Sequence, residues 1–168
     1  MGLDVRGPAR GSSRYITHGM CEDCAKRLLT ELSIPLGEFL DSLGAPILLL
    51  GSDLQIRTGN KKARELLGKG LSSIEGSMPG EIIGCVHSRV GGGCGKTAHC
   101  ASCTIRMSLS ETYATGNGLL RVPAYPDVEV ESEVRRLSIL ISTEKVGDAV
   151  LLRIDELVEA PEVRGSDL

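Results

Sequence analysis

The extended apolar segments of this chain fall into two groups, and a glycine-rich stretch separates them. The first group is APILLLGSDLQIRTGN, residues 45–60, in which two extended runs flank a Gly-Ser-Asp turn signal and predict a β-hairpin. The second group consists of LLRVPAY, RRLSILIST and AVLLRID, which begin at residues 119, 135 and 149. Two predicted strands therefore precede the middle of the chain and three follow it.

Helical patterns occupy the rest of the chain. Apolar residues recur at helical spacing on both sides of Pro35, which predicts two short helices meeting there: Ala25, Leu28, Leu29 and Leu32 before it, and Leu36, Phe39, Leu40 and Leu43 after it. Asn60 stands at a capping position before KKARELLG, where Gly68 ends the predicted helix. A longer helix is expected from residue 104 to Gly116.

In this order the segments resemble a PAS domain, over roughly residues 36–157. ILLLGSDLQIRTGNKKARELLG is similar to the opening PAS hairpin and its Asn-x-x-Ala helix, with Asn60 and Ala63 in the matching positions. MPGEIIGC resembles a later short helix, SLSETYATGN the long helix, and LSILIST with VLLRID the last two strands. The resemblance implies an α+β fold, a five-stranded antiparallel sheet with helices on one face. A short helical N-terminal segment is expected to precede it.

The patterns divide the chain into four parts. Residues 1–15 are rich in Gly, Ser, Arg and Pro without hydrophobic periodicity, which predicts a disordered leader. Residues 16–35 are expected to form a helical segment that carries a Cys-x-x-Cys pair. Residues 36–157 correspond to the PAS-like sensor domain, and residues 158–168 to an acidic tail.

Composition narrows the function classes. A net charge of −3 and an aromatic content of 2% provide neither attraction for phosphates nor stacking surfaces for bases, so nucleic acid is not an expected partner. The chain contains no apolar run long enough for a membrane span or a signal peptide, which predicts a cytoplasmic location without membrane contact. The sequence has neither a catalytic triad signature nor a thioredoxin-like context, so the chain is not expected to be an enzyme.

Four cysteines fall within nineteen residues, in GCVHSRVGGGCGKTAHCASC: Cys85, Cys94, Cys100 and Cys103. In a reducing compartment such a group indicates metal ligands before disulfides. The last two form a chelating Cys-x-x-Cys pair, and glycines at 91, 92, 93 and 95 let the backbone bend around a bound ion. On the PAS template this segment lies on the side where haem or flavin cofactors are held.

The spacing leaves the metal open. Structural zinc sites usually have two tight pairs, whereas eight residues separate Cys85 from Cys94. Irregular spacing favours an iron–sulfur cluster over zinc. Some bacterial PAS sensors carry an oxygen-labile cluster on four cysteines, although in two tight pairs. His87 and His99 are possible substitutes for a cysteine ligand. The alternative, that the cysteines are small core hydrophobes, also remains.

A second pair of cysteines lies upstream, in THGMCEDC. His18, Cys21 and Cys24 form a possible second metal site, one ligand short of a closed zinc site. A second copy of the chain, or Glu22 or Asp23, would complete it. A dithiol switch at a helix N-terminus and two thiols without a role are the alternatives.

These observations predict a cytoplasmic signal-sensing module. The four cysteines would sense oxygen or redox state through an iron–sulfur cluster or another metal, and the module would signal through protein–protein contacts. The expected partner is a second copy of the chain or a signalling protein such as a histidine kinase. By the resemblance, the helix from Leu36 to Leu43 would form the partner surface, unless it only covers the core. The alternative function is a zinc-stabilised interaction module without a sensing role.

Overall fold

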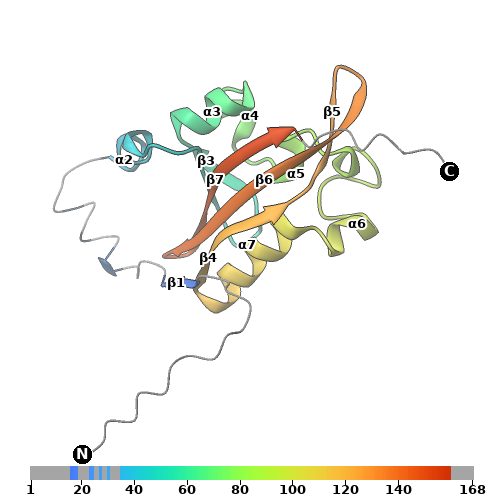
Figure 1. Cartoon of the computed structure of the whole chain (residues 1–168). Coiled ribbons are helices and arrows are strands. Elements are labelled where there is room, and N and C mark those ends of the chain that lie inside the picture. The colour runs from blue at the N-terminus through green and yellow to red at the C-terminus, as the bar shows by residue number, and fades with distance from the viewer. Residues whose placement is uncertain (1–15, 19–22, 25–26, 28–29, 31–34, 160–168) are drawn as a thin grey trace, which may run out of the picture.

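Seven β-strands are present in the described part of the structure, a computed structural model that covers residues 16–18, 23–24, 27, 30 and 35–159 (Figure 1). Their bounds are β1 Ile16–His18, β2 Ile47–Leu50, β3 Ile56–Gly59, β4 Asn117–Ala124, β5 Asp127–Val130, β6 Glu133–Val146 and β7 Ala149–Glu159. All paired strands are antiparallel, in the order β1-β4-β6-β7-β2-β3, and β5 pairs with β6 outside this path. The five expected strands appear as β2, β3, β4, β6 and β7.

Asn60 determines how the chain leaves the β2–β3 hairpin. Its side-chain oxygen accepts hydrogen bonds from the amides of Ala63 and Ile47, both at 2.9 Å. Its side-chain nitrogen donates to the carbonyl oxygens of Leu40, at 3.0 Å, and Ala45, at 2.8 Å. The expected helix cap is confirmed, and this buried amide also joins the helix to β2 and to the preceding helix.

The helices end where the sequence indicates. Gly68 and Gly116 are left-handed, with φ of 61° and 78°, and terminate the two helices that the sequence assigns to them.

No helix among the described residues is long and apolar enough to cross a membrane. The helix bounds are α2 Leu36–Ser42, α3 Lys61–Leu67, α4 Leu71–Ile74, α5 Pro79–Ile82, α6 Ala98–Ala101 and α7 Thr104–Thr115, with a 3₁₀ turn, η1, at Val86–Ser88.

The hydrophobic core lies between the helices and one face of the sheet (Figure 1). Helix α3 packs against β2, α4 against β3, and α7 against β4, β6 and β7. The buried cluster combines helix and strand residues: Ala63, Ile74, Ile82, Ile105 and Leu109 with Leu48, Leu50, Ile56, Ile139, Ile141, Val150 and Leu152. The α+β class, with helices on one face of an antiparallel sheet, is confirmed.

Two strands differ from the sequence expectation. Residues 16–18, placed by the sequence in a helical segment, instead extend along the edge strand β4, with Ile16 opposite Leu119. Unpaired backbone groups on an edge strand attract such a segment, whereas three residues carry no readable periodicity. Strand β5 is also unexpected and forms a hairpin with β6. The leader over 1–15 lies outside the described residues; β7 continues to Glu159, and the rest of the expected tail is likewise outside them.

Candidate functional site

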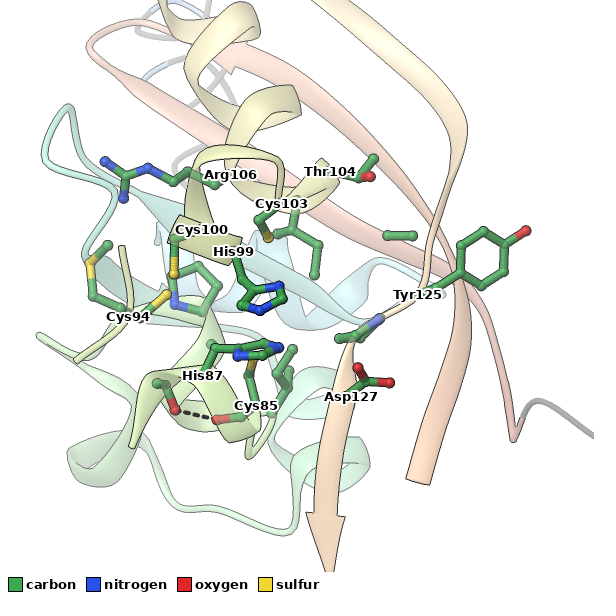
Figure 2. A pocket seen from close by; sticks show the side chains of 18 of the residues that line it. Cys85, His87, Cys94, His99, Cys100, Cys103, Thr104, Arg106, Tyr125 and Asp127 are labelled. Atoms are coloured by element: carbon green, nitrogen blue, oxygen red, sulfur yellow. Dashed lines mark hydrogen bonds between the residues drawn. The ribbon is translucent and has the colours of Figure 1, made fainter. Parts of the chain in front are cut away.

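The four clustered cysteines line one cavity of about 300 Å³, between the segment from α5 to α7 and strand β5 (Figure 2). Cys85 precedes η1, and Cys94 lies in the glycine-rich loop that follows it. Cys100 lies in α6, and Cys103 is the N-cap residue of α7. The structure thus brings to one cavity the four residues that the sequence singles out, on four consecutive local elements.

Glycines allow the cysteine loop to pack closely against its neighbours. Gly95 has a φ of +89°, and a Cβ atom there would lie 2.3 Å from Nη1 of Arg106. Gly80, in α5, lies against Cys94, because a Cβ atom there would be 2.7 Å from the Cys94 Sγ and 3.6 Å from the Cys85 Cβ. A methyl group at Gly80 would collide with Cys94, and at Gly95 the left-handed backbone disfavours any larger residue.

The Cys100 sulfur is surrounded by hydrogen-bond donors. Its Sγ lies 3.3 Å from the Thr97 hydroxyl oxygen and accepts a hydrogen bond from the Gly95 amide at 3.2 Å. The hydrogen bond with the Thr97 side chain, with further ones from the backbone of Thr97, Gly95 and Lys96, holds the pKa of Cys100 below its ordinary value. The loop therefore favours the thiolate at this cysteine, the form that binds metals and acts as a nucleophile.

Cys94 has the opposite electrostatic environment. Burial raises the pKa of its thiol, and negative charge on Cys100, Cys103 and Cys85 raises it further, against a lowering hydrogen bond from the Gly80 backbone. Negative charge on the other three cysteines thus disfavours the Cys94 thiolate, and a bound cation would offset this effect.

His87 and His99 stack face to face across the cavity, with ring centroids 4.0 Å apart and an angle of 18° between the rings (Figure 2). The lone pair of an imidazole nitrogen lies in the plane of its ring, and a bound metal lies about 2 Å from that nitrogen. Two nearly parallel, stacked rings therefore do not direct their lone pairs at one ion. In this arrangement at most one of the two histidines could replace a cysteine at a single centre.

Asp127, from β5 (Figure 2), and Arg136, from β6, line the same cavity as the cysteines. The Arg136 guanidinium donates two hydrogen bonds to the Asp127 carboxylate, at 2.8 and 3.1 Å, and holds the pKa of Asp127 below its ordinary value. The Glu129 amide donates to the carbonyl of Gly84, at 3.1 Å, beside Cys85. These bonds fix β5 as a wall of the cavity.

The chemistry of the site suits a metal held by sulfur. Four thiols form a soft ligand set of the kind that binds zinc or iron–sulfur clusters, and the Gly95 N–H group donates a hydrogen bond to one of them. In the described part of the chain, however, no three Cys, His, Asp or Glu side chains already stand as ligands of one ion. Ligation by all four cysteines requires the sulfurs to draw together. The glycine-rich loop that carries Cys94 has the backbone freedom for this movement.

The upstream pair lies mostly beyond what the structure describes. His18 is the last residue of β1, opposite Asn117 of β4. Cys24 is exposed, and Cys21 lies outside the described residues. The possible second site formed by His18, Cys21 and Cys24 therefore stays a prediction.

Three features of the cavity were not apparent from the sequence pattern. Asp127 stands two residues after Tyr125, the last residue of the extended segment LLRVPAY. Nothing in the spacing indicated that β5 returns to the cysteines. Arg106 and Thr97 carry no motif either, although both lie near the cysteines in the sequence. A signal was available only for Arg106, since the stretch between Glu81 and Glu111 contains basic residues and no acidic one.

No family model matches this chain, and no curated protein matches it. Solved structures with a similar backbone include the PAS domain of nitrogen regulation protein NR(II) from Vibrio parahaemolyticus, 13% identical, with a TM-score of 0.46 over 73% of this chain and 99% of that one. The photoactive yellow protein domain of the sensor histidine kinase Ppr from Rhodospirillum centenum is 12% identical, with a TM-score of 0.45 over 77% and 99% of the two chains. The PAS domain of BvgS from Bordetella pertussis is 11% identical, with a TM-score of 0.44 over 80% and 89%. At these identities and TM-scores, no function is transferred from those proteins to this chain.

Proposed function

We propose that this chain is a PAS-like signal-sensing module in which Cys85, Cys94, Cys100 and Cys103 bind an iron–sulfur cluster that reports oxygen or redox state. The single observation that carries the proposal is the convergence of four thiols on one cavity, where three of them destabilise negative charge on the fourth. A metal centre resolves this conflict, because its positive charge favours all four thiolates at once.

The local environment of each sulfur supports this assignment. Backbone N–H groups face Cys100, and hydrogen bonds to ligand sulfurs are one means by which proteins tune iron–sulfur clusters. Hydrogen bonds lower the pKa of Cys100, whereas burial raises that of Cys94, so the Cys94 thiolate depends more strongly on a bound metal.

The choice of an iron–sulfur cluster over zinc rests on the spacing of the ligands. Eight residues separate Cys85 from Cys94, and the intervening chain forms a 3₁₀ turn and a glycine-rich loop where a zinc site would usually have a tight pair. A bound cluster would supply a redox-active centre whose loss or change of charge depends on oxygen and on reductants.

Helix α7 supports a route from the site to a partner. It begins directly after Cys103 and packs against β4, β6 and β7, so a change at the cysteines alters the packing of the helix on the sheet. We propose that a second copy of the chain or a signalling protein such as a histidine kinase reads this change in a reducing, cytoplasmic environment. Helix α2, attached through Asn60, is the proposed contact surface.

Anaerobic purification followed by metal and sulfide analysis tests the proposal. We expect iron and acid-labile sulfide in comparable amounts, a brown colour and a broad visible absorption that bleaches in air. Replacing Cys94 and Cys103 together by Ala should abolish the colour and the bound iron. The matched control is Ser110→Ala, which changes an exposed residue of α7 outside the cavity and should retain both.

The other outcomes are equally clear. A colourless protein with one zinc ion per chain would indicate that the chain is a zinc-stabilised interaction module without a sensing role. A protein that binds no metal, and whose thermal stability is unchanged by Cys94→Ala with Cys103→Ala, would refute both functions.

A further inference from the structure

Arg106 lies directly on the cysteine loop without being a possible ligand. It belongs to the first turn of α7, and its guanidinium rests on Gly95, within 3.7 Å of the position that a Cβ atom would take. The Gly95 amide donates to the Cys100 sulfur, so the positive charge of Arg106 stands one residue from Cys94 and beside the donor to Cys100. The side chain is half-buried and lines the same cavity as the four cysteines.

The fold gives no other reason for this charge. Among the residues that the structure describes, no carboxylate forms an ion pair with Arg106, whereas the nearby Arg89 is paired with Glu129. A cation in the first turn of a helix is also unfavourable, because the N-terminus of the helix dipole is positive. Arg106 therefore stands where a helix by itself would favour an acidic residue.

We propose that Arg106 is a positioning residue of the sulfur site, which supplies the positive charge that balances the thiolates. The inference rests on the proposed function and deepens it. Four thiolates with one Zn²⁺, or with a cluster core of charge +2, leave a net negative charge that a cation about one residue away stabilises.

Zinc binding to the metal-free, reduced protein measures this role. Competition with a chromogenic chelator should show that Arg106→Gln weakens Zn²⁺ binding by about ten-fold, as expected for a group that acts through the ligands. Arg106→Lys, which keeps the charge, should recover most of the affinity. In protein loaded with an iron–sulfur cluster, Arg106→Gln should lower the midpoint potential, because the more negative reduced state loses its nearby cation.

The matched control is Arg89→Gln, which lies directly after η1, ahead of Cys94, but is neutralised by Glu129 and should change the zinc affinity by less than about two-fold. Urea unfolding of the metal-free proteins separates this role from a structural one. Because Arg106 opposes the helix dipole, metal-free Arg106→Gln should be at least as stable as the wild type. A structural arginine would give a less stable variant.

The two proposals fail in different ways. If the wild type binds neither zinc nor a cluster, the proposed function fails and this inference fails with it. If the wild type binds zinc and Arg106→Gln binds it equally tightly, or Arg106→Lys binds it as weakly as the Gln variant, only the role of Arg106 is refuted.

Discussion

At the scale of single residues, the site depends on glycines as much as on cysteines. Gly80 is the clearest case, since the Cys94 sulfur occupies the space where any other residue would carry its Cβ atom. Gly80 is buried in α5 and follows Pro79, so its backbone has little room to move away. The position of Cys94 is thus set from outside its own loop.

Gly80→Ala should therefore disturb the sulfur site. We expect it to lower the free energy of unfolding by about 1–3 kcal/mol, as overpacking does, and to reduce the amount of bound metal. Urea unfolding and metal analysis of the same samples measure both effects. Gly44→Ala is the matched control, because no atom lies within 4 Å of the added methyl group and its φ is not positive. Equal stability and equal metal content in the two variants would contradict this account of Cys94.

At the scale of elements, α7 connects the cysteines to the sheet. The helix begins beside Cys103, and near its other end the Thr112 hydroxyl meets that of Thr143 in β6 at an oxygen–oxygen distance of 2.6 Å. The Leu119 amide of β4 also donates to the Thr143 hydroxyl, at 3.3 Å. A buried pair of hydroxyls thus joins the helix to two neighbouring strands.

Thr112→Val preserves the shape of this side chain and removes its hydroxyl. We expect it to lower the free energy of unfolding by about 1–3 kcal/mol, because Thr143 keeps a buried hydroxyl with one partner fewer. Ser110→Ala, on the exposed face of the same helix, should change it by less than about 0.5 kcal/mol. Chemical denaturation of both variants is the measurement, and a Thr112→Val protein as stable as the Ser110→Ala protein would show that the pair does not hold the helix.

At the scale of the whole molecule, metal binding and folding should be coupled. A chelator should lower the midpoint of thermal unfolding, since a ligand present at about 1,000 times its dissociation constant adds about 4 kcal/mol to the free energy of unfolding. The pH dependence follows from Cys94. Its raised pKa keeps the thiol protonated at neutral pH in the metal-free protein, so a metal must displace that proton. The apparent metal affinity should accordingly rise between about pH 6 and pH 8.

Chelator competition at several pH values measures this slope, with the thermal midpoints of the loaded and metal-free proteins recorded alongside. An affinity independent of pH would mean that the cysteines are already deprotonated before the metal binds. A thermal midpoint that the chelator leaves unchanged would mean that the metal contributes nothing to the stability of the fold.

The elements that the sequence predicted correctly are those with local causes. The β2–β3 hairpin, the Asn60 cap and the helix ends at Gly68 and Gly116 depend on turn chemistry and on backbone conformations within a few residues. The central strands follow from their apolar runs. The four cysteines line one cavity for a similar reason, because they lie in one short segment that bends at glycines, whereas metal binding by them stays a prediction.

The elements that the sequence did not indicate depend on distant partners. β1 forms because its backbone pairs with the edge of β4. β5 forms because it pairs with the first residues of β6 in a hairpin. Neither segment has a periodicity that separates it from a loop. Asp127 and Arg136 reached the cavity only through this hairpin, and the stacking of His87 on His99 likewise required both to be placed in space.

The sequence by itself determined that β2 and β3 precede, and β4, β6 and β7 follow, a cysteine-bearing, glycine-rich middle, since these features arise from residue types and short spacings. The tertiary structure alone decided the electrostatic character of the site. It lowered the pKa of Cys100 and raised that of Cys94, and it placed the guanidinium of Arg106 on Gly95. The physical reason is that burial and charge act through space, over distances that separation along the chain does not specify.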